Sequence, residues 1–188
     1  MNNVKKLILD KAKERMERFG FKKTTMDEIS KDCRISKKTI YEHFTDKEDM
    51  FKCLMERECH SSIAIIFSQM GDVSDPLERL VLLTRKAIAH FNQDHFTTRI
   101  LKDEELFLAF VNRKYHEMID EEIISIIAQI IREGKEQGKF RDVDERVVAY
   151  AGFKLFQAFS YTRTKPLNPD QDYTEILIDF LVNAIVKK

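Results

Sequence analysis

Apolar residues recur at intervals of three and four along most of the chain, and this spacing limits the fold more than any other feature. Such intervals place the apolar side chains on one face of an α-helix. Glycine and proline, which tight turns between strands need, number only 5 and 3 among 188 residues. We therefore expect an all-α protein of about nine helices, at residues 3–18, 25–32, 36–42, about 46–69, 76–92, 95–109, 113–136, 143–162 and 169–186.

Short polar patterns indicate where several of these helices begin and end. The tetrapeptides Thr25-Met26-Asp27-Glu28 and Thr45-Asp46-Lys47-Glu48 each place a hydroxyl three residues before a carboxylate, which is the capping-box pattern. Ser36 is a further candidate N-cap. Gly20 and Gly138 stand where helices would end, since glycine readily adopts the left-handed conformation found there. The N-terminal part of the chain is therefore expected to form short helices with well-marked starts.

Charge is unevenly distributed along the chain. Basic and acidic residues number 32 each, but residues 1–50 contain 13 of the basic and 10 of the acidic ones. This modest positive excess permits contact with an anionic partner such as nucleic acid, without requiring it. We expect an N-terminal domain of three helices over residues 1–46 and a larger helical domain over residues 47–188.

The helices expected at residues 25–32 and 36–42 are separated by three residues, which suits the turn of a helix-turn-helix unit. The second of them is short and mostly polar, with Ile40 as its buried residue. Lys37 and Lys38 occupy its first turn, where the helix dipole disfavours a positive charge unless an anion is near. A phosphate backbone would supply that anion, so we predict double-stranded DNA as a partner.

The segment FGFKKTTMDEISKDCRISKKTIYEHFTDKEDMF resembles the DNA-binding segment of the tetracycline-repressor (TetR) family of bacterial transcription regulators. The matching features are a glycine before a threonine pair, an Ile-Ser turn, and the pattern Thr39-Ile40-Tyr41-x-x-Phe44. The family often has glycine in the turn, where this chain has Arg34; a left-handed arginine would cost about 1 kcal/mol relative to glycine. The resemblance implies a DNA-binding surface made of Thr25, Arg34, Ser36, Lys37, Lys38, Thr39, Tyr41, His43 and Lys47.

The resemblance also implies a regulator, most commonly a repressor, that a small-molecule effector releases from a palindromic operator. The effector would bind in the larger domain, and its identity is unknown. The 14 Phe and 7 Met residues suit an apolar effector, although they suit an ordinary core equally. Residues that could turn toward a pocket, each of which could equally be an ordinary surface residue, are His90, Phe91, Phe96, Arg99, His116, Tyr150, Lys154 and Gln157.

The last two expected helices are apolar on two sides. One stripe of the first contains Val147, Tyr150 and Phe159, and a second stripe lies beside it. Two apolar faces exceed what one chain can cover, so we predict a homodimer. We assign its interface to the second stripe and to the last helix, at Ala149, Gly152, Phe153, Phe156, Ser160, Ile178 and Val182. A dimeric helical module that binds proteins, without specific DNA binding, stays open as the alternative function.

Other kinds of site lack support in the sequence. Three cysteines without a CxxC pair and five dispersed histidines predict neither a disulfide framework nor a metal site, and no cofactor is expected. Neighbouring carboxylates in the acidic runs point to different sides of a helix, and no phosphate-binding or nucleophile motif occurs, so we do not expect an enzyme. No apolar run reaches the ~18 residues of a membrane span and no signal-peptide pattern opens the chain, so we expect a cytoplasmic protein.

Overall fold

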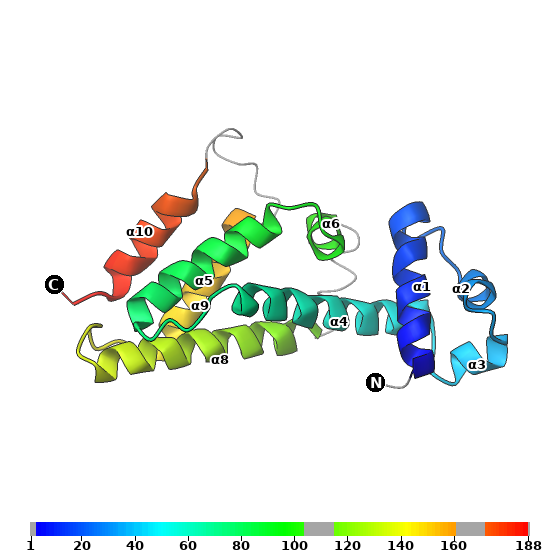
Figure 1. Cartoon of the computed structure of the whole chain (residues 1–188), viewed down its shortest axis with the longest axis horizontal. Coiled ribbons are helices and arrows are strands. Elements are labelled where there is room, and N and C mark those ends of the chain that lie inside the picture. Colours follow the sequence, from blue (N-terminus) through cyan, green and yellow to red (C-terminus); the bar gives the residue numbers. More distant parts are fainter. Residues whose placement is uncertain (1–2, 104–114, 161–171, 188) are drawn as a thin grey trace. The chain divides into compact units, whose positions relative to one another are not determined.

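A computed structural model describes residues 3–103, 115–160 and 172–187 of the chain. Within these ranges the regular structure is α-helical, apart from one isolated β-bridge between Phe140 and Val186 (Figure 1). The all-α prediction is confirmed, although the parts of it at 104–109, 113–114, 161–162 and 169–171 lie outside the described residues. The helices are α1 (Asn3–Phe19), α2 (Met26–Cys33), α3 (Lys37–Tyr41), α4 (Lys47–Ser68), α5 (Pro76–Phe91), α6 (Phe96–Lys102), α8 (Tyr115–Glu136), α9 (Glu145–Ser160) and α10 (Thr174–Ile185).

The chain divides into two compact units, Met1–His60 and Ser61–Lys188. This division falls inside α4, whereas the sequence placed a boundary at its start, between residues 46 and 47. The first turns of α4 belong to the first unit because their apolar side chains are buried there. The Phe51 ring lies 4.8 Å from that of Phe21, and Phe51 is only 4% exposed.

The first unit is built by packing α1 against α2 and α2 against α3. Its core contains Ile8, Ile29, Ile40 and Phe44, none of which is more than 1% exposed. Burying each of these side chains contributes about 1.5–3 kcal/mol. The inward face of α2 includes Cys33, and burial raises the pKa of its thiol to about 11.

One of the two predicted capping boxes is confirmed, and at the other Asp46 is the N-cap in place of the predicted Thr45. At α2, the Glu28 amide donates to Thr25 Oγ1 at 3.3 Å, and the Thr25 amide donates to Glu28 Oε2 at 3.0 Å. At α4, the amide of Asp49 donates to Asp46 Oδ1 at 2.6 Å, and the Thr45 amide donates to Asp49 Oδ2 at 3.0 Å. Asp46 therefore caps α4, because the helix begins at the next residue and places Asp49 at its third position.

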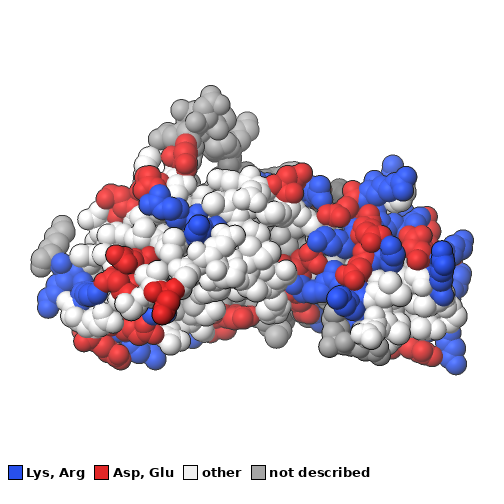
Figure 2. Space-filling view, in the orientation of Figure 1, with Lys and Arg blue, Asp and Glu red and all other residues white. Residues whose placement is uncertain are grey.

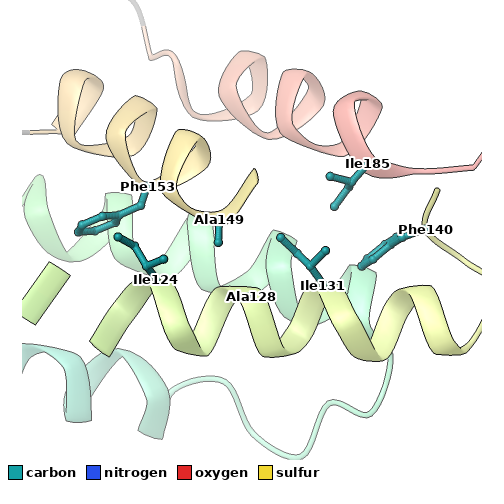
Figure 3. Close-up of a cluster of buried hydrophobic side chains, with 7 residues drawn as sticks. All are labelled: Ile124, Ala128, Ile131, Phe140, Ala149, Phe153 and Ile185. Atoms are coloured by element: carbon teal, nitrogen blue, oxygen red, sulfur yellow. The ribbon is translucent and has the colours of Figure 1, made fainter. Parts of the chain in front are cut away.

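In the second unit, α8 packs against both α5 and α9, and α10 packs mainly against α5. The isoleucine-rich α8 therefore occupies a central position in this unit. Figure 3 shows the core cluster of this unit, which consists of Ile124, Ala128, Ile131, Phe140, Ala149, Phe153 and Ile185.

The turn after α8 is hydrogen-bonded to the C-terminal end of α10. Gly138 ends the preceding helix with φ +70°, as predicted. The Phe140 ring then folds over Gly134, where an added Cβ would lie 2.1 Å from the ring. Beside it, the Arg141 amide donates to the Ile185 carbonyl at 2.9 Å. Gly134 is thus required for close packing inside a helix, a role that the sequence pattern does not reveal.

The predicted dimer interface is wrong for four of its seven residues. Ala149, Phe153, Ser160 and Ile178 are 0%, 4%, 6% and 7% exposed within the single chain, so they have little surface left for a partner. The other stripe of α9 is the exposed one. Both stripes are apolar and lie on one helix, so periodicity alone does not tell which faces α8.

Candidate nucleic-acid interface

The turn between α2 and α3 keeps the helix-turn-helix geometry although it has no glycine. Arg34 adopts a left-handed conformation, with φ 56° and ψ 40°. The Ile35 amide donates to the Ser30 carbonyl and the Arg34 amide donates to the Lys31 carbonyl, both at 3.0 Å. This pair of bonds is the Schellman motif that commonly ends a helix. The sequence left open whether Arg34 alters the turn, and the backbone shows the left-handed form in place.

The short helix α3 has one buried side and an exposed polar side. Ile40 is fully buried, whereas Lys37, Lys38 and Tyr41 are exposed, Tyr41 by 52%. Ser36 caps the helix, since the Thr39 amide donates to Ser36 Oγ at 3.0 Å. A helix anchored by one isoleucine thus presents two ammonium groups and a phenol to solvent, which are groups that donate to phosphates and base edges.

The two α3 lysines differ in their partners. Lys37 forms an ion pair with Asp27 on α2, and both side chains are exposed, by 63% and 46%. Such an exposed pair contributes at most about 1 kcal/mol, so a phosphate can displace it at small cost. Lys38 has no ion-pair partner in the part of the chain that the structure describes. Figure 2 shows that basic and acidic side chains intermingle over the first unit.

Thr25 and Lys47 are engaged within the first unit. The Thr25 hydroxyl donates to Glu28 Oε2 at 2.9 Å. The ammonium of Lys47 donates to the Phe21 carbonyl at 3.0 Å and lies 4.3 Å from the centroid of the Phe21 ring. Arg15 pairs with Glu28 at 2.8 Å, and these bonds hold the pKa of the Glu28 carboxyl below its ordinary value. His43 is half-buried near the end of α3.

In the second unit, three of the expected pocket residues lie close together. His90 is 7% exposed and stacks on His95 with ring centroids 4.6 Å apart. The neighbouring Phe91 contacts the Phe156 ring on α9 at 5.7 Å. Phe96, at the start of α6, is 5% exposed. His116 lies on α8, and its side chain is outside the described residues.

The other four expected pocket residues are placed differently. Arg99 is exposed and pairs with Asp94 at 3.5 Å, and Tyr150 is 54% exposed, so neither lines an enclosed pocket. Lys154 and Gln157 bind the same carboxylate of Asp120 on α8, at 2.6 and 3.2 Å. These two side chains fasten α9 to α8, so the structure gives them an internal role in place of the predicted ligand contact.

An open hollow of about 270 Å3 lies on the outer side of α8 and α9. Its lining includes the exposed Val147 and Tyr150, and the ion pair between Arg146 and Glu121, 2.7 Å long, borders it. Among the described residues, no group of three or more metal-ligating side chains occurs. Over the same ranges, no helix combines the length and apolarity needed to cross a bilayer.

Comparison with known proteins agrees with this geometry. Residues 8–54 match the model for bacterial regulatory proteins of the tetR family, and residues 73–161 match the tetracyclin repressor-like C-terminal domain. The nucleoid occlusion factor SlmA of Vibrio cholerae is 30% identical over 152 residues, covering 78% of this chain and 76% of its own. The chain is a member of the TetR family.

Two further similarities are consistent with that membership. The uncharacterized HTH-type transcriptional regulator YhgD of Bacillus subtilis is 28% identical to this TetR-family chain over 170 residues, covering 88% of this chain and 86% of its own. A crystal structure of AibR in complex with isovaleryl coenzyme A and operator DNA has a TM-score of 0.59 and 23% identity, covering 97% of each chain. At this identity the second similarity shows the fold alone.

Sequence analysis missed several buried polar residues of this TetR-family chain. Thr97, Thr98 and Ser160 are 3%, 2% and 6% exposed, and Ser160 had been assigned to a dimer interface. Serine and threonine are common on both faces of amphipathic helices, so their positions carried no signal. Their burial becomes visible only once the helices of the second unit are packed together.

Proposed function

We propose that this TetR-family regulator is a repressor that binds a palindromic operator as a homodimer and leaves it when a small molecule binds the second unit. The family membership makes it a transcriptional regulator with a DNA-binding domain. The observation that carries the proposal is the exposed side of α3, which is cationic and hydroxyl-rich on a helix fixed by the buried Ile40.

The proposed DNA contacts separate into two groups. Ser36, Lys38, Thr39 and Tyr41 on or beside α3 are candidates to meet base edges and flanking phosphates. Residues outside α3 set the register by contacting the backbone only, and these are Thr25, Arg34, His43 and Lys47. Lys37 joins the first group when phosphate replaces its exposed partner Asp27.

The proposed dimer uses the exposed faces of α9 and α10. Val147, Tyr150 and Phe159 on α9 are 64%, 54% and 48% exposed, and Ile176 and Phe180 on α10 are 55% and 59% exposed. Large apolar side chains gathered on adjoining helices are typical of a protein interface. A two-fold dimer would carry two copies of α3, which matches the symmetry of a palindromic operator.

Release by an effector requires that the effector bind the two states of the dimer unequally. The shift in operator affinity equals that difference in binding free energy, commonly about 1–3 kcal/mol. The AibR structure, a complex with both isovaleryl coenzyme A and operator DNA, shows a similar fold holding a small molecule and DNA. That precedent supports the proposal, and α4 is the candidate connection because it runs from one unit into the other.

The decisive experiment is a gel shift and footprint with the DNA upstream of the protein's own gene. Wild-type protein is expected to protect a palindromic site. Lys38→Ala should weaken binding at least tenfold and alter sequence preference, because an ammonium that reads guanine contributes about 1–3 kcal/mol. Lys86→Ala, the same charge change on α5, is the control and should leave the footprint unchanged. Sequence-indifferent binding by wild type would instead favour the protein-interaction module.

The dimer is tested by light scattering. Phe180→Asp should give monomers, because it places a carboxylate in the proposed apolar interface. Phe19→Asp, at a side chain of similar exposure on α1, should remain dimeric. A dimeric Phe180→Asp protein would remove α10 from the interface. Phe156 is unsuitable for this test, since its ring contacts Phe91 and Phe153 within the chain.

A further inference from the structure

Three hydrogen-bonding side-chain atoms in the second unit are buried without a partner in the described part of the chain. They are Nε2 of His90, Oγ1 of Thr98 and Oγ of Ser160, which come from α5, α6 and α9. The three residues are 7%, 2% and 6% exposed. Buried polar groups are rarely left unpaired, because they lose hydration without compensation. Three such atoms in one unit indicate hydrogen-bonding capacity that the fold itself does not use.

Ring contacts link the helices that carry these three residues. His90, in the last turn of α5, stacks on His95, and α6 begins at the next residue and carries Thr98 in its first turn. Phe91 contacts a ring on α9 that lies one turn before Ser160. Figure 1 shows the end of α5 leading directly to α6. The three unpaired atoms therefore lie on helices that the ring pairs His90–His95 and Phe91–Phe156 connect.

The surroundings of these atoms are apolar and uncharged. Phe96 is buried in the first turn of α6, and none of the buried side chains described between residues 61 and 188 is formally charged. Burial lowers the pKa of His90, so its imidazole is neutral at pH 7. The cation of Arg99 is exposed and paired with Asp94. An ionised group among such neighbours would lose its hydration without a counter-charge, whereas carbonyl and hydroxyl groups would find donors and acceptors.

We infer that the effector is an apolar molecule whose buried end carries an uncharged hydrogen-bonding group, such as a ketone, an ester or a hydroxyl, held by His90, Thr98 and Ser160. This inference rests on the proposed effector-controlled function and defines the chemical class of the effector. It distinguishes neutral ligands from fatty acids and amines of the same size, because only the charged compounds must bury an ion.

The first test needs no ligand. Thr98→Val replaces a buried unpaired hydroxyl with a methyl group of similar size, so the Tm of the free protein should rise by about 2–4 °C. Thr97→Val is the matched control on the adjacent residue, whose hydroxyl lies 3.4 Å from that of Ser62. The control should not raise Tm, because it removes a paired hydroxyl. Equal losses of Tm in both variants would show that the Thr98 hydroxyl is already paired, and would overturn the inference.

The second test measures binding by calorimetry at pH 7.5, with 2-decanone and decanoate as probes of equal chain length. The ketone should bind at least tenfold more tightly than the carboxylate. Thr98→Val and Ser160→Ala should each weaken ketone binding about tenfold, whereas Thr97→Val should change it less than twofold. Tighter binding of decanoate, no binding of either probe, or unchanged binding by both variants would overturn the inference.

Gel shifts with the same probes separate this inference from the proposed function. Ketone that binds the protein but leaves the DNA complex intact would refute release by an effector while the inference on ligand class stands. Dissociation of the complex by decanoate alone would support release and refute the neutral class. Dissociation by 2-decanone, lost in Thr98→Val but kept in Thr97→Val, supports both.

Discussion

The two units differ in the pairing of some of their buried hydroxyl groups. In the first unit, Thr24 and Ser30 are 0% and 3% exposed, and each donates to a backbone carbonyl at 2.8 Å. In the second unit, the similarly buried Thr98 and Ser160 have no partner in the described residues. The first unit thus pairs these two hydroxyls within a few residues of sequence, whereas these two hydroxyls of the second unit have no such partner.

This difference matches the tasks proposed for the two units. A surface that reads DNA must hold its donors in fixed positions, which local caps and locally paired buried hydroxyls help to achieve. A unit that responds to a ligand must have interactions left to make, because a ligand shifts an equilibrium only through contacts that differ between states.

The largest expected effect is the unfolding of the first unit while the second unit stays folded. Phe44→Ala removes a ring that is 1% exposed and should cost about 3–5 kcal/mol, most of the stability of a unit of this size. We expect DNA binding to disappear while the calorimetric transition of the second unit keeps its temperature. Phe19→Ala, at a ring 43% exposed, should cost less than about 1 kcal/mol. A single transition that moves as a whole would show that the units do not unfold separately.

A smaller effect is expected from Gly134→Ala in the second unit. The new methyl group would lie 2.1 Å from the Phe140 ring, so the ring must move and the fold should lose about 1–3 kcal/mol. The control is Gly152→Ala in α9, where the nearest atom is 3.4 Å away and the change should stabilise the helix by up to about 1 kcal/mol. Denaturant unfolding measures both. Stabilisation by both alanines would contradict the packing at Phe140.

Arg34→Gly should stabilise the first unit by about 1 kcal/mol, because glycine adopts φ 56° without the steric cost of a side chain. The midpoint of denaturant unfolding reports this gain. A gel shift then tests whether the arginine also binds DNA. If it does, the affinity of the variant for DNA should fall although its first unit is more stable. Lost stability would mean that the Arg34 side chain makes contacts that outweigh the strain.

The smallest expected effect concerns acid sensitivity of the first unit. Hydrogen bonds from Arg15 and Thr25 lower the pKa of Glu28 below its ordinary 4.5, so its carboxylate stabilises the fold above that pH. This contribution is lost as the pH falls below 4.5 and through the lower value of the folded state. Glu28→Gln preserves an N3 side chain able to complete the cap but removes the charge. Wild type and variant should differ at pH 7 and converge in acid, and a constant difference would assign the effect to something other than the charge.

The helices and the helix-turn-helix surface were largely predictable because their signals are local. A cap joins residues three apart, as Thr25 joins Glu28, and an amphipathic stripe spans a few turns. The same locality explains the error at α4, where Thr45 and Asp46 both suit an N-cap and only the backbone shows which one the helix uses. The hydrogen bond from Lys47 to the Phe21 carbonyl joins residues 26 apart in the chain, so no short sequence pattern predicts it.

By itself, the sequence determined that the chain is helical, where the recognition helix lies, and that the last helices have more apolar surface than one chain buries. Only the tertiary structure decided which stripe of α9 turns inward and which polar residues of α5, α6 and α9 are buried. The physical reason is that hydrophobic burial is non-directional. Either of two apolar stripes on one helix can therefore pack into the core. The neighbouring helices, which come from distant parts of the chain, decide which stripe is covered.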